Sequence, residues 1–115
     1  GNAYIYLQEQ LDESSFVEER PSGLIIRRSK GERVNHLYRG AKAIISYNES
    51  RKNITISTAD AIPNLSCRRL AQEWWGDRAG GHNQIAGSAR GKIMSEEQFN
   101  EAITKFEDIL IRSLT

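Results

Sequence analysis

The segment KAIISYN-ESRK-NITIST, from Lys42 to Thr58, decides the fold of this chain. Two runs rich in β-branched residues, Lys42–Asn48 and Asn53–Thr58, are separated by four polar residues, which is typical of two strands joined by a turn. Alternate residues of the second run share one face of a strand, and that face carries Ile54, Ile56 and Thr58. The pattern predicts an antiparallel hairpin.

A first helix is predicted after this hairpin, from about Leu65 to Trp75, with Asn64 or Ser66 as its cap. Gly76 stands where a glycine commonly ends a helix. Residues at helical spacing predict one apolar face, made of Cys67, Leu70, Ala71 and Trp74. Trp75 lies about 100° from that face. It either covers a neighbouring element or is free to stack on a nucleic-acid base.

A second helix begins after Ser95, which forms a Ser-x-x-Gln capping box with Gln98. Met94 and Phe99 occupy the two positions of a hydrophobic staple. An apolar stripe at helical spacing then follows, made of Phe99, Ala102, Ile103, Phe106, Ile109 and Leu110. The stripe predicts a helix that packs on the rest of the domain.

The remaining segments complete the order of elements. Ala3–Leu7 and Gly23–Arg28 are predicted as strands, and a turn at Arg20–Gly23 precedes the second of them. Gln8–Glu19 is interpreted as a loop or a short helix, and Ile85–Arg90 as a short strand between the two helices. The order predicts an α+β domain, with a mainly antiparallel or mixed β-sheet of about five strands and two helices packed on it.

Length and charge limit the class of protein. A chain of 115 residues corresponds to a single domain, residues 1–115. A net charge of +1 provides no bulk attraction to nucleic acid or membrane, and no apolar run approaches the roughly 20 residues of a membrane span. The single cysteine, Cys67, fits a reducing, cytoplasmic location. Because the chain begins with Gly1 rather than Met, we expect it to be a piece excised or processed from a larger protein.

The stretch DRAGGHNQIAG, residues 77–87, carries the candidate chemistry. Its three glycines leave the backbone free to adopt positive φ and to form a nest of N–H groups around an anion. Its phosphate-binding side chains would be Arg78, His82 and Arg90, with Asn83 and Gln84 as further polar donors. On residue chemistry alone, the stretch is also compatible with a helix C-cap, a glycine turn and a surface imidazole.

Within this stretch, AGGHNQIAG (Ala79–Gly87) resembles the GGGH-x-x-A-A-G signature of the DHH-associated domain. That domain is the C-terminal half of DHH-family phosphoesterases, which include nucleases, cyclic-dinucleotide phosphodiesterases and exopolyphosphatase-related enzymes. The resemblance covers roughly Lys42–Leu114. It implies that an N-terminal DHH domain of the same protein binds two catalytic manganese ions, while this chain binds the substrate.

The resemblance implies a nucleotide or short oligonucleotide as the partner. Because the sequence has no HExxH, paired-Cys or His-x-His spacing, we expect no catalytic residue, metal or cofactor within this chain. Gly80, Gly81 and His82 would contact the phosphate or base, and Gly87 would allow close strand packing. With the flanking polar residues, the predicted substrate-binding set is Arg78, Gly80, Gly81, His82, Asn83, Gly87 and Arg90.

Two departures from the family pattern affect the candidate site. Ala79 replaces the first glycine of the signature, and the strand at Ile56–Asp60 lacks the arginine of the family's Ser-x-Arg-Ser stretch. The missing contact is either absent or supplied by Arg78 or Arg90. The Asp-His-His triplet of the catalytic domain does not occur in this sequence.

Two other functional classes stay open on sequence grounds. The domain also resembles the C-terminal part of alanyl-tRNA synthetases, which implies a nucleic-acid-binding or dimerisation module without hydrolytic activity, and a homodimer fits this reading. In a purely structural domain, the glycine stretch would be only a tight turn. A set of basic residues either forms a track for a single strand or is simply solvated; it consists of Arg27, Arg28, Lys30, Arg33 and Arg39.

Overall fold

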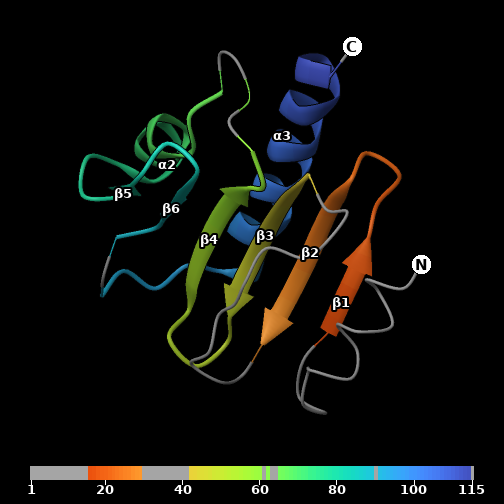
Figure 1. Ribbon diagram of the computed structural model, residues 1–115. Helices are drawn as coiled ribbons and strands as arrows, with labels where there is room; N and C mark the ends of the chain where they lie inside the picture. Colours follow the sequence, from red (N-terminus) through yellow and green to blue (C-terminus); the bar gives the residue numbers. More distant parts are fainter. Residues whose placement is uncertain (1–15, 30–41, 61, 63–64, 90, 115) are drawn as a thin grey trace.

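The computed structural model describes residues 16–29, 42–60, 62, 65–89 and 91–114. Within these residues, six strands form one sheet and two helices pack on it (Figure 1). The strands are β1 (Phe16–Glu19), β2 (Leu24–Ser29), β3 (Ala43–Asn48), β4 (Asn53–Thr58), β5 (Gly80–Gly81) and β6 (Ile85–Gly87). The helices are α2 (Cys67–Trp75) and α3 (Glu96–Leu114). The predicted α+β class is confirmed.

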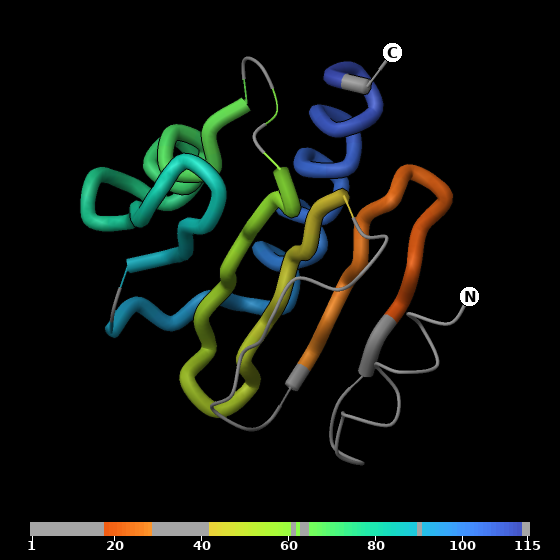
Figure 2. Tube along the Cα trace, viewed as in Figure 1, coloured from red at the N-terminus to blue at the C-terminus, as the bar shows by residue number. Residues whose placement is uncertain are grey.

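The sheet has the strand order β1-β2-β3-β4-β6-β5. β2 and β3 run parallel, and every other neighbouring pair is antiparallel. Figure 2 shows the path of the chain from β4 into α2, back through β5 and β6, and then to α3. This path places β5 at one edge of the sheet, beside α2.

The hairpin of β3 and β4 forms as the sequence predicts. Its turn is stabilised by Asn48, whose Oδ1 accepts hydrogen bonds from the amides of Ser50 at 2.9 Å and Arg51 at 3.0 Å. Lys52 completes the turn with a φ of 58°. The local side-chain acceptor explains why this polar segment folds back tightly.

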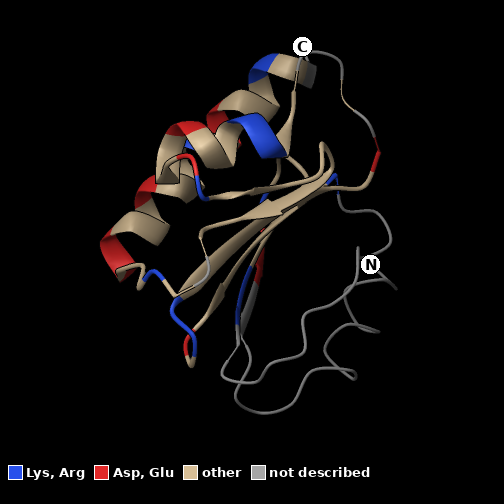
Figure 3. Cartoon of the chain, turned by 90° about the vertical axis from the view of Figure 1, so that its left-hand side faces the viewer, with Lys and Arg blue, Asp and Glu red and all other residues tan. Residues whose placement is uncertain are grey.

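Both helices lie on the same side of the sheet (Figure 3), and this covered face contains the core. Its strand residues include Leu24, Ile26, Ile45, Tyr47, Ile54 and Ile56, and its helix residues include Ala71, Phe99, Phe106 and Leu110. We call the opposite side the second face of the sheet. No helix in the described part of the chain is long and apolar enough to cross a bilayer.

The capping box predicted at the start of α3 is present. Gln98 Oε1 accepts a hydrogen bond from the Ser95 amide at 2.8 Å, and Ser95 Oγ accepts one from the Gln98 amide at 3.1 Å. Phe99 stacks on Tyr47 with ring centroids 5.2 Å apart, and the Tyr47 hydroxyl donates to Met94 O at 2.8 Å. These contacts join the first turn of α3 to the middle of the sheet.

One prediction about an individual element was wrong, and another was incomplete. Residues 16–19, at the end of the predicted loop or helix Gln8–Glu19, form strand β1, because Phe16 and Val17 favour a strand and the segment pairs with β2. The predicted apolar face of α2 was incomplete: Cys67 and Ala71 are buried and Leu70 and Trp74 pack on the core, as predicted, but Trp75 belongs to the core as well. Trp75 is only 6% exposed, whereas Trp74 is half-buried and meets Phe106 of α3 edge-on at 6.4 Å.

The helix α2 contacts both the sheet edge and α3, so two of its sides are covered. For this reason the single-stripe pattern included Trp74 but not Trp75, which is the more deeply buried of the two. The buried Trp75 has no free ring face on which a base could stack. The predicted strand Ala3–Leu7 and the basic residues Lys30, Arg33 and Arg39 lie outside the described residues.

Candidate functional site

The glycine stretch folds into a short hairpin at the edge of the sheet, formed by β5 and β6 (Figure 1). Gly80 is opposite Gly87, and Gly81 is opposite Ala86. The His82 amide donates to Ile85 O at 2.6 Å. The chain therefore reverses through only two residues, Asn83 and Gln84.

Two glycines are required by the geometry of this hairpin. Gly80 and Gly81 have φ values of 155° and 146°, a region that other residues rarely adopt. A Cβ on Gly81 would also lie 2.5 Å from Ile85 O. The sequence correctly predicted positive φ here, but the backbone is extended rather than curled into a nest.

One amide of the hairpin is directed outward. Hydrogen-bonded and non-hydrogen-bonded pairs alternate along an antiparallel ladder. Because the His82 amide bonds to Ile85, the next pair, Gly81 with Ala86, is a non-hydrogen-bonded pair. The N–H of Gly81 consequently faces away from β6, toward the free edge of the sheet.

The tip of the hairpin is held by two neighbouring elements. Asn83 O accepts from the Cys67 amide at 2.8 Å, and Asn83 Oδ1 accepts from Ser66 Oγ at 2.9 Å. Gln84 O accepts from the Thr58 amide at 2.9 Å. Asn83, one of the predicted substrate ligands, therefore has a structural role at the N-terminus of α2.

His82 is exposed, and its position in the ladder determines its direction. Side chains of directly opposite residues lie on the same face of a sheet, so His82 shares a face with Ile85. Ile85 is in turn opposite Ser57 of β4. The neighbouring pair, Ala86 and Ile56, lies in the core, so the imidazole is on the second face.

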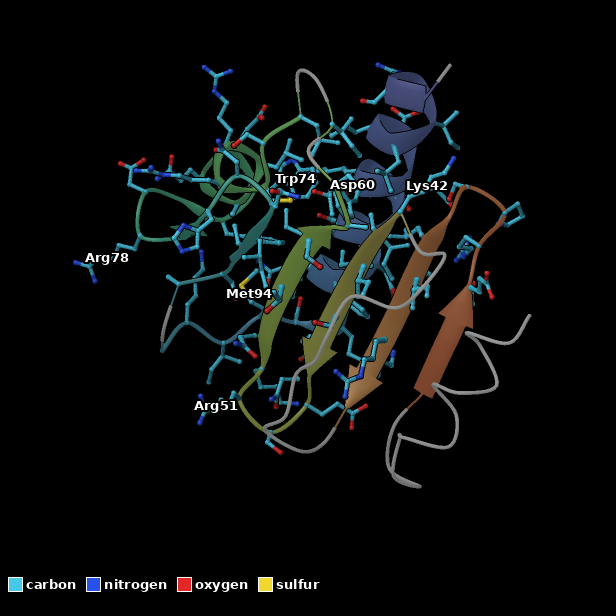
Figure 4. The ribbon with its side chains drawn as sticks, in the orientation of Figure 1. Lys42, Arg51, Asp60, Trp74, Arg78 and Met94 are labelled. Carbon is cyan, nitrogen blue, oxygen red and sulfur yellow. The ribbon has the colours of Figure 1, made fainter. Side chains whose placement is uncertain are left out.

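The structure brings most of the predicted set together but not all of it. Gly80, Gly81, His82, Asn83 and Gly87 all belong to the hairpin. Arg78 is exposed, and its side chain points outward, away from the sheet (Figure 4). Arg90 lies outside the described residues.

Gly87 has the geometry expected of a close-packing residue, because a Cβ there would lie 2.8 Å from Ile54 O on β4. The substitution of Ala79 for the first glycine of the signature is also explained. Ala79 is buried and has a negative φ, and its amide closes a turn with Gly76 O at 3.0 Å. No glycine is needed at this position.

Burial raises the pKa of the Cys67 thiol to about 12 because the apolar surroundings disfavour the thiolate. This thiol is therefore a packing residue and not a nucleophile. Among the described residues, no group of three His, Cys, Asp or Glu side chains comes together as a metal site would require.

Ile85 is a candidate contact residue that the sequence reasoning missed. Its side chain is 48% exposed although it is large and apolar, and it is opposite His82 in the hairpin. The signal was present in the signature itself, because Ile85 occupies a position where GGGH-x-x-A-A-G has alanine.

Comparisons with known proteins agree at the level of the fold. No family model and no curated sequence matches the chain. The crystal structure of an exopolyphosphatase-related protein from Bacteroides fragilis has a TM-score of 0.56 at 16% identity, over 96% of this chain and 36% of that one. A pGpG-specific phosphodiesterase from Vibrio cholerae has a TM-score of 0.54 at 12% identity, over 97% of this chain and 40% of that one.

This chain spans well under half of the length of either protein. At such low identity, the likeness concerns the fold and not the chemistry. The chain therefore shares its fold with one part of an exopolyphosphatase-related protein and one part of a phosphodiesterase.

Proposed function

We propose that this chain is the substrate-binding domain of a DHH-type, manganese-dependent phosphoesterase, and that its glycine hairpin binds the phosphate of a nucleotide or short oligonucleotide. The observation that carries the proposal is the placement of His82 and the outward amide of Gly81 on neighbouring residues of one exposed edge.

The chemistry of this edge suits an anionic oxygen. An imidazole N–H and a backbone N–H are both donors, and a donor that meets a charged acceptor forms a stronger hydrogen bond than a neutral pair does. Glycine at residues 80 and 81 leaves no side chain to keep a ligand away from the backbone. The bonds from Thr58 and Cys67 fix the hairpin before any ligand arrives.

In this proposal, hydrolysis belongs to a manganese-binding DHH domain of the same protein, and the residues of this chain bind and orient the phosphate. Two observations support the division of roles. The sequence signature resembles that of the associated domain, and both proteins of similar fold are named for phosphate chemistry and are more than twice as long as the matched part.

Calorimetric binding of pGpG to the full 115-residue chain tests the proposal. We expect measurable binding that weakens about tenfold or more in His82→Ala, because a hydrogen bond to a charged group contributes about 1.5–3 kcal/mol. Asn100→Ala, an exposed change on α3, serves as the control and leaves binding unchanged.

Equal binding by the His82→Ala variant would contradict the proposal, as would absence of binding at millimolar concentrations. Binding of a long single-stranded RNA that depends steeply on salt but not on His82 would instead support a nucleic-acid-binding module.

A further inference from the structure

We infer that Arg68 and Gln72 of α2 extend the anion site along the free edge of the sheet, and that Arg68 supplies the positive charge that the hairpin lacks. The inference rests on the proposed function of His82 and Gly81. It adds two binding residues from a different element of the fold.

The first observation is the lack of positive charge in the hairpin itself. Residues 53–58 and 79–87, which form β4 and the hairpin, contain no lysine or arginine. A phosphate is bound more strongly where a cationic side chain accompanies neutral donors. The side chain of Arg78 points away from the sheet (Figure 4). Among the described residues, a cation for this site therefore has to come from another element.

The second observation is the direction in which α2 is turned. One side of the helix packs on α3, where Trp74 meets Phe106 edge-on. Each residue of a helix is rotated by about 100° from the previous one, which places Gln72 and Arg68 about 160° and 120° from Trp74. A Cβ on Gly80 would lie 3.7 Å from Gln72 Nε2. This flank of α2 therefore lies beside β5 and faces the free edge of the sheet.

Two contacts determine how the hairpin lies along α2. Gln72 is beside Gly80, and the Cys67 amide donates to Asn83 O at 2.8 Å. The chain from Gly80 to Asn83 therefore runs alongside the helix from Gln72 back to Cys67. Arg68, the second residue of α2, is accordingly level with the outer part of the hairpin, which carries the imidazole and the outward amide.

The side chains of Arg68 and Gln72 are free to bind a ligand. Arg68 is exposed, and it forms no ion pair with a carboxylate of the described residues. A guanidinium and a primary amide both donate to phosphate oxygens. Bond lengths place Gly81 N about 3 Å from the Cβ position of Gly80, so Gln72 Nε2 is at most about 7 Å from Gly81 N. Two donors at that separation can reach different oxygens of one phosphate.

Calorimetric binding of pGpG to the full 115-residue chain, measured at several salt concentrations, tests the inference. We expect Arg68→Gln to weaken binding about tenfold, and to reduce the slope of the logarithm of the binding constant against the logarithm of salt concentration by roughly one. Arg68→Lys keeps the charge and should restore the slope. Gln72→Glu, which replaces the donor by an anionic acceptor, should also weaken binding about tenfold.

Arg69→Gln is the matched control. Arg69 is exposed in the same turn of α2, but it is rotated about 100° farther from the sheet, so the affinity and the slope should both stay as in wild type. Urea unfolding should give the same stability for both arginine variants, because both side chains are exposed.

Wild-type affinity in Arg68→Gln overturns the inference. An equal loss in Arg69→Gln also overturns it, because the effect would then come from surface charge in general. If Arg68→Gln has no effect while His82→Ala clearly weakens binding, only the role of α2 fails. If the wild-type chain does not bind pGpG, the proposed function fails, and this inference fails with it.

Discussion

Gly81 combines a φ of 146° with a site where an added Cβ would lie 2.5 Å from Ile85 O. Both features disfavour any other residue, so we expect Gly81→Ala to lower the free energy of unfolding by roughly 2–3 kcal/mol. Urea denaturation monitored by circular dichroism measures this change.

Gly91→Ala is the matched control for that substitution. Gly91 has a φ of 80°, but nothing lies within 4 Å of its added Cβ, so the variant carries only the conformational cost. Equal destabilisation by the two variants would mean that the close approach of the added Cβ to Ile85 O does not contribute to the destabilisation of Gly81→Ala.

At the scale of single residues, the sequence predicted the conformational freedom of the glycines but not the contacts of the side chains around them. The positive φ of residues 80 and 81 was predicted, because glycine is the residue that adopts it most readily. The bond from Ser66 to Asn83 joins residues 17 positions apart, so only the fold reveals that Asn83 holds α2. Exposure of Ile85 likewise depends on which face of β6 the helices cover.

The capping box of α3 is a local element whose energy can be measured. We expect Ser95→Ala to destabilise the chain by about 1 kcal/mol, because the Gln98 amide loses its acceptor at the start of the helix. Thermal and urea unfolding measure the change. Ser113→Ala, an exposed change near the end of the same helix, should have little effect, and an equal loss in both variants would argue against capping.

Elements encoded by short-range patterns were predicted well. The β3–β4 hairpin and the capping box depend on residues only a few positions apart, and both formed. Strand β5 has two residues and no apolar alternation, so no local pattern identifies it. β1 combines the strand-forming Phe16 and Val17 with two glutamates, and it is too short to be recognised without its pairing with β2.

At the scale of the whole molecule, one ion pair joins β2 to the first residue of α3. Arg28 Nη1 donates to Glu96 Oε1 at 2.7 Å, and the two residues are 68 positions apart. Arg28 also lies over the ring of Phe99, 5.3 Å from its centroid. The hydrogen bond from Arg28 lowers the pKa of Glu96 below its ordinary value of 4.5.

A lowered pKa in the folded chain means that the pair stabilises folding above pH 4.5 and that this contribution is lost as pH falls through the folded-state value. We expect wild type to be more stable than Glu96→Gln at pH 7, and the difference to shrink as the pH falls below 4.5. Urea denaturation at several pH values tests this. Glu97→Gln, which removes a carboxylate from the same turn, should not reproduce the pattern.

The overall class could be predicted because strand and helix periods alone imply two layers. The parallel pairing of β2 with β3 and the position of β5 at the sheet edge depend on contacts distant in sequence, and periodicity carries no information about them. The residues of the candidate site could therefore be proposed from the sequence, but the hairpin that they form at the sheet edge could not.

The attachment of the glycine hairpin has a kinetic consequence. Its tip accepts one hydrogen bond from the first turn of α2 and another from the end of β4, so swinging it aside would unravel the ends of two other elements. Such a segment is unsuited to act as a hinged flap. A ligand that reaches the hairpin binds to a surface that is already formed. The rate of association therefore depends on diffusional encounter and orientation, and not on a slow closing step of the protein.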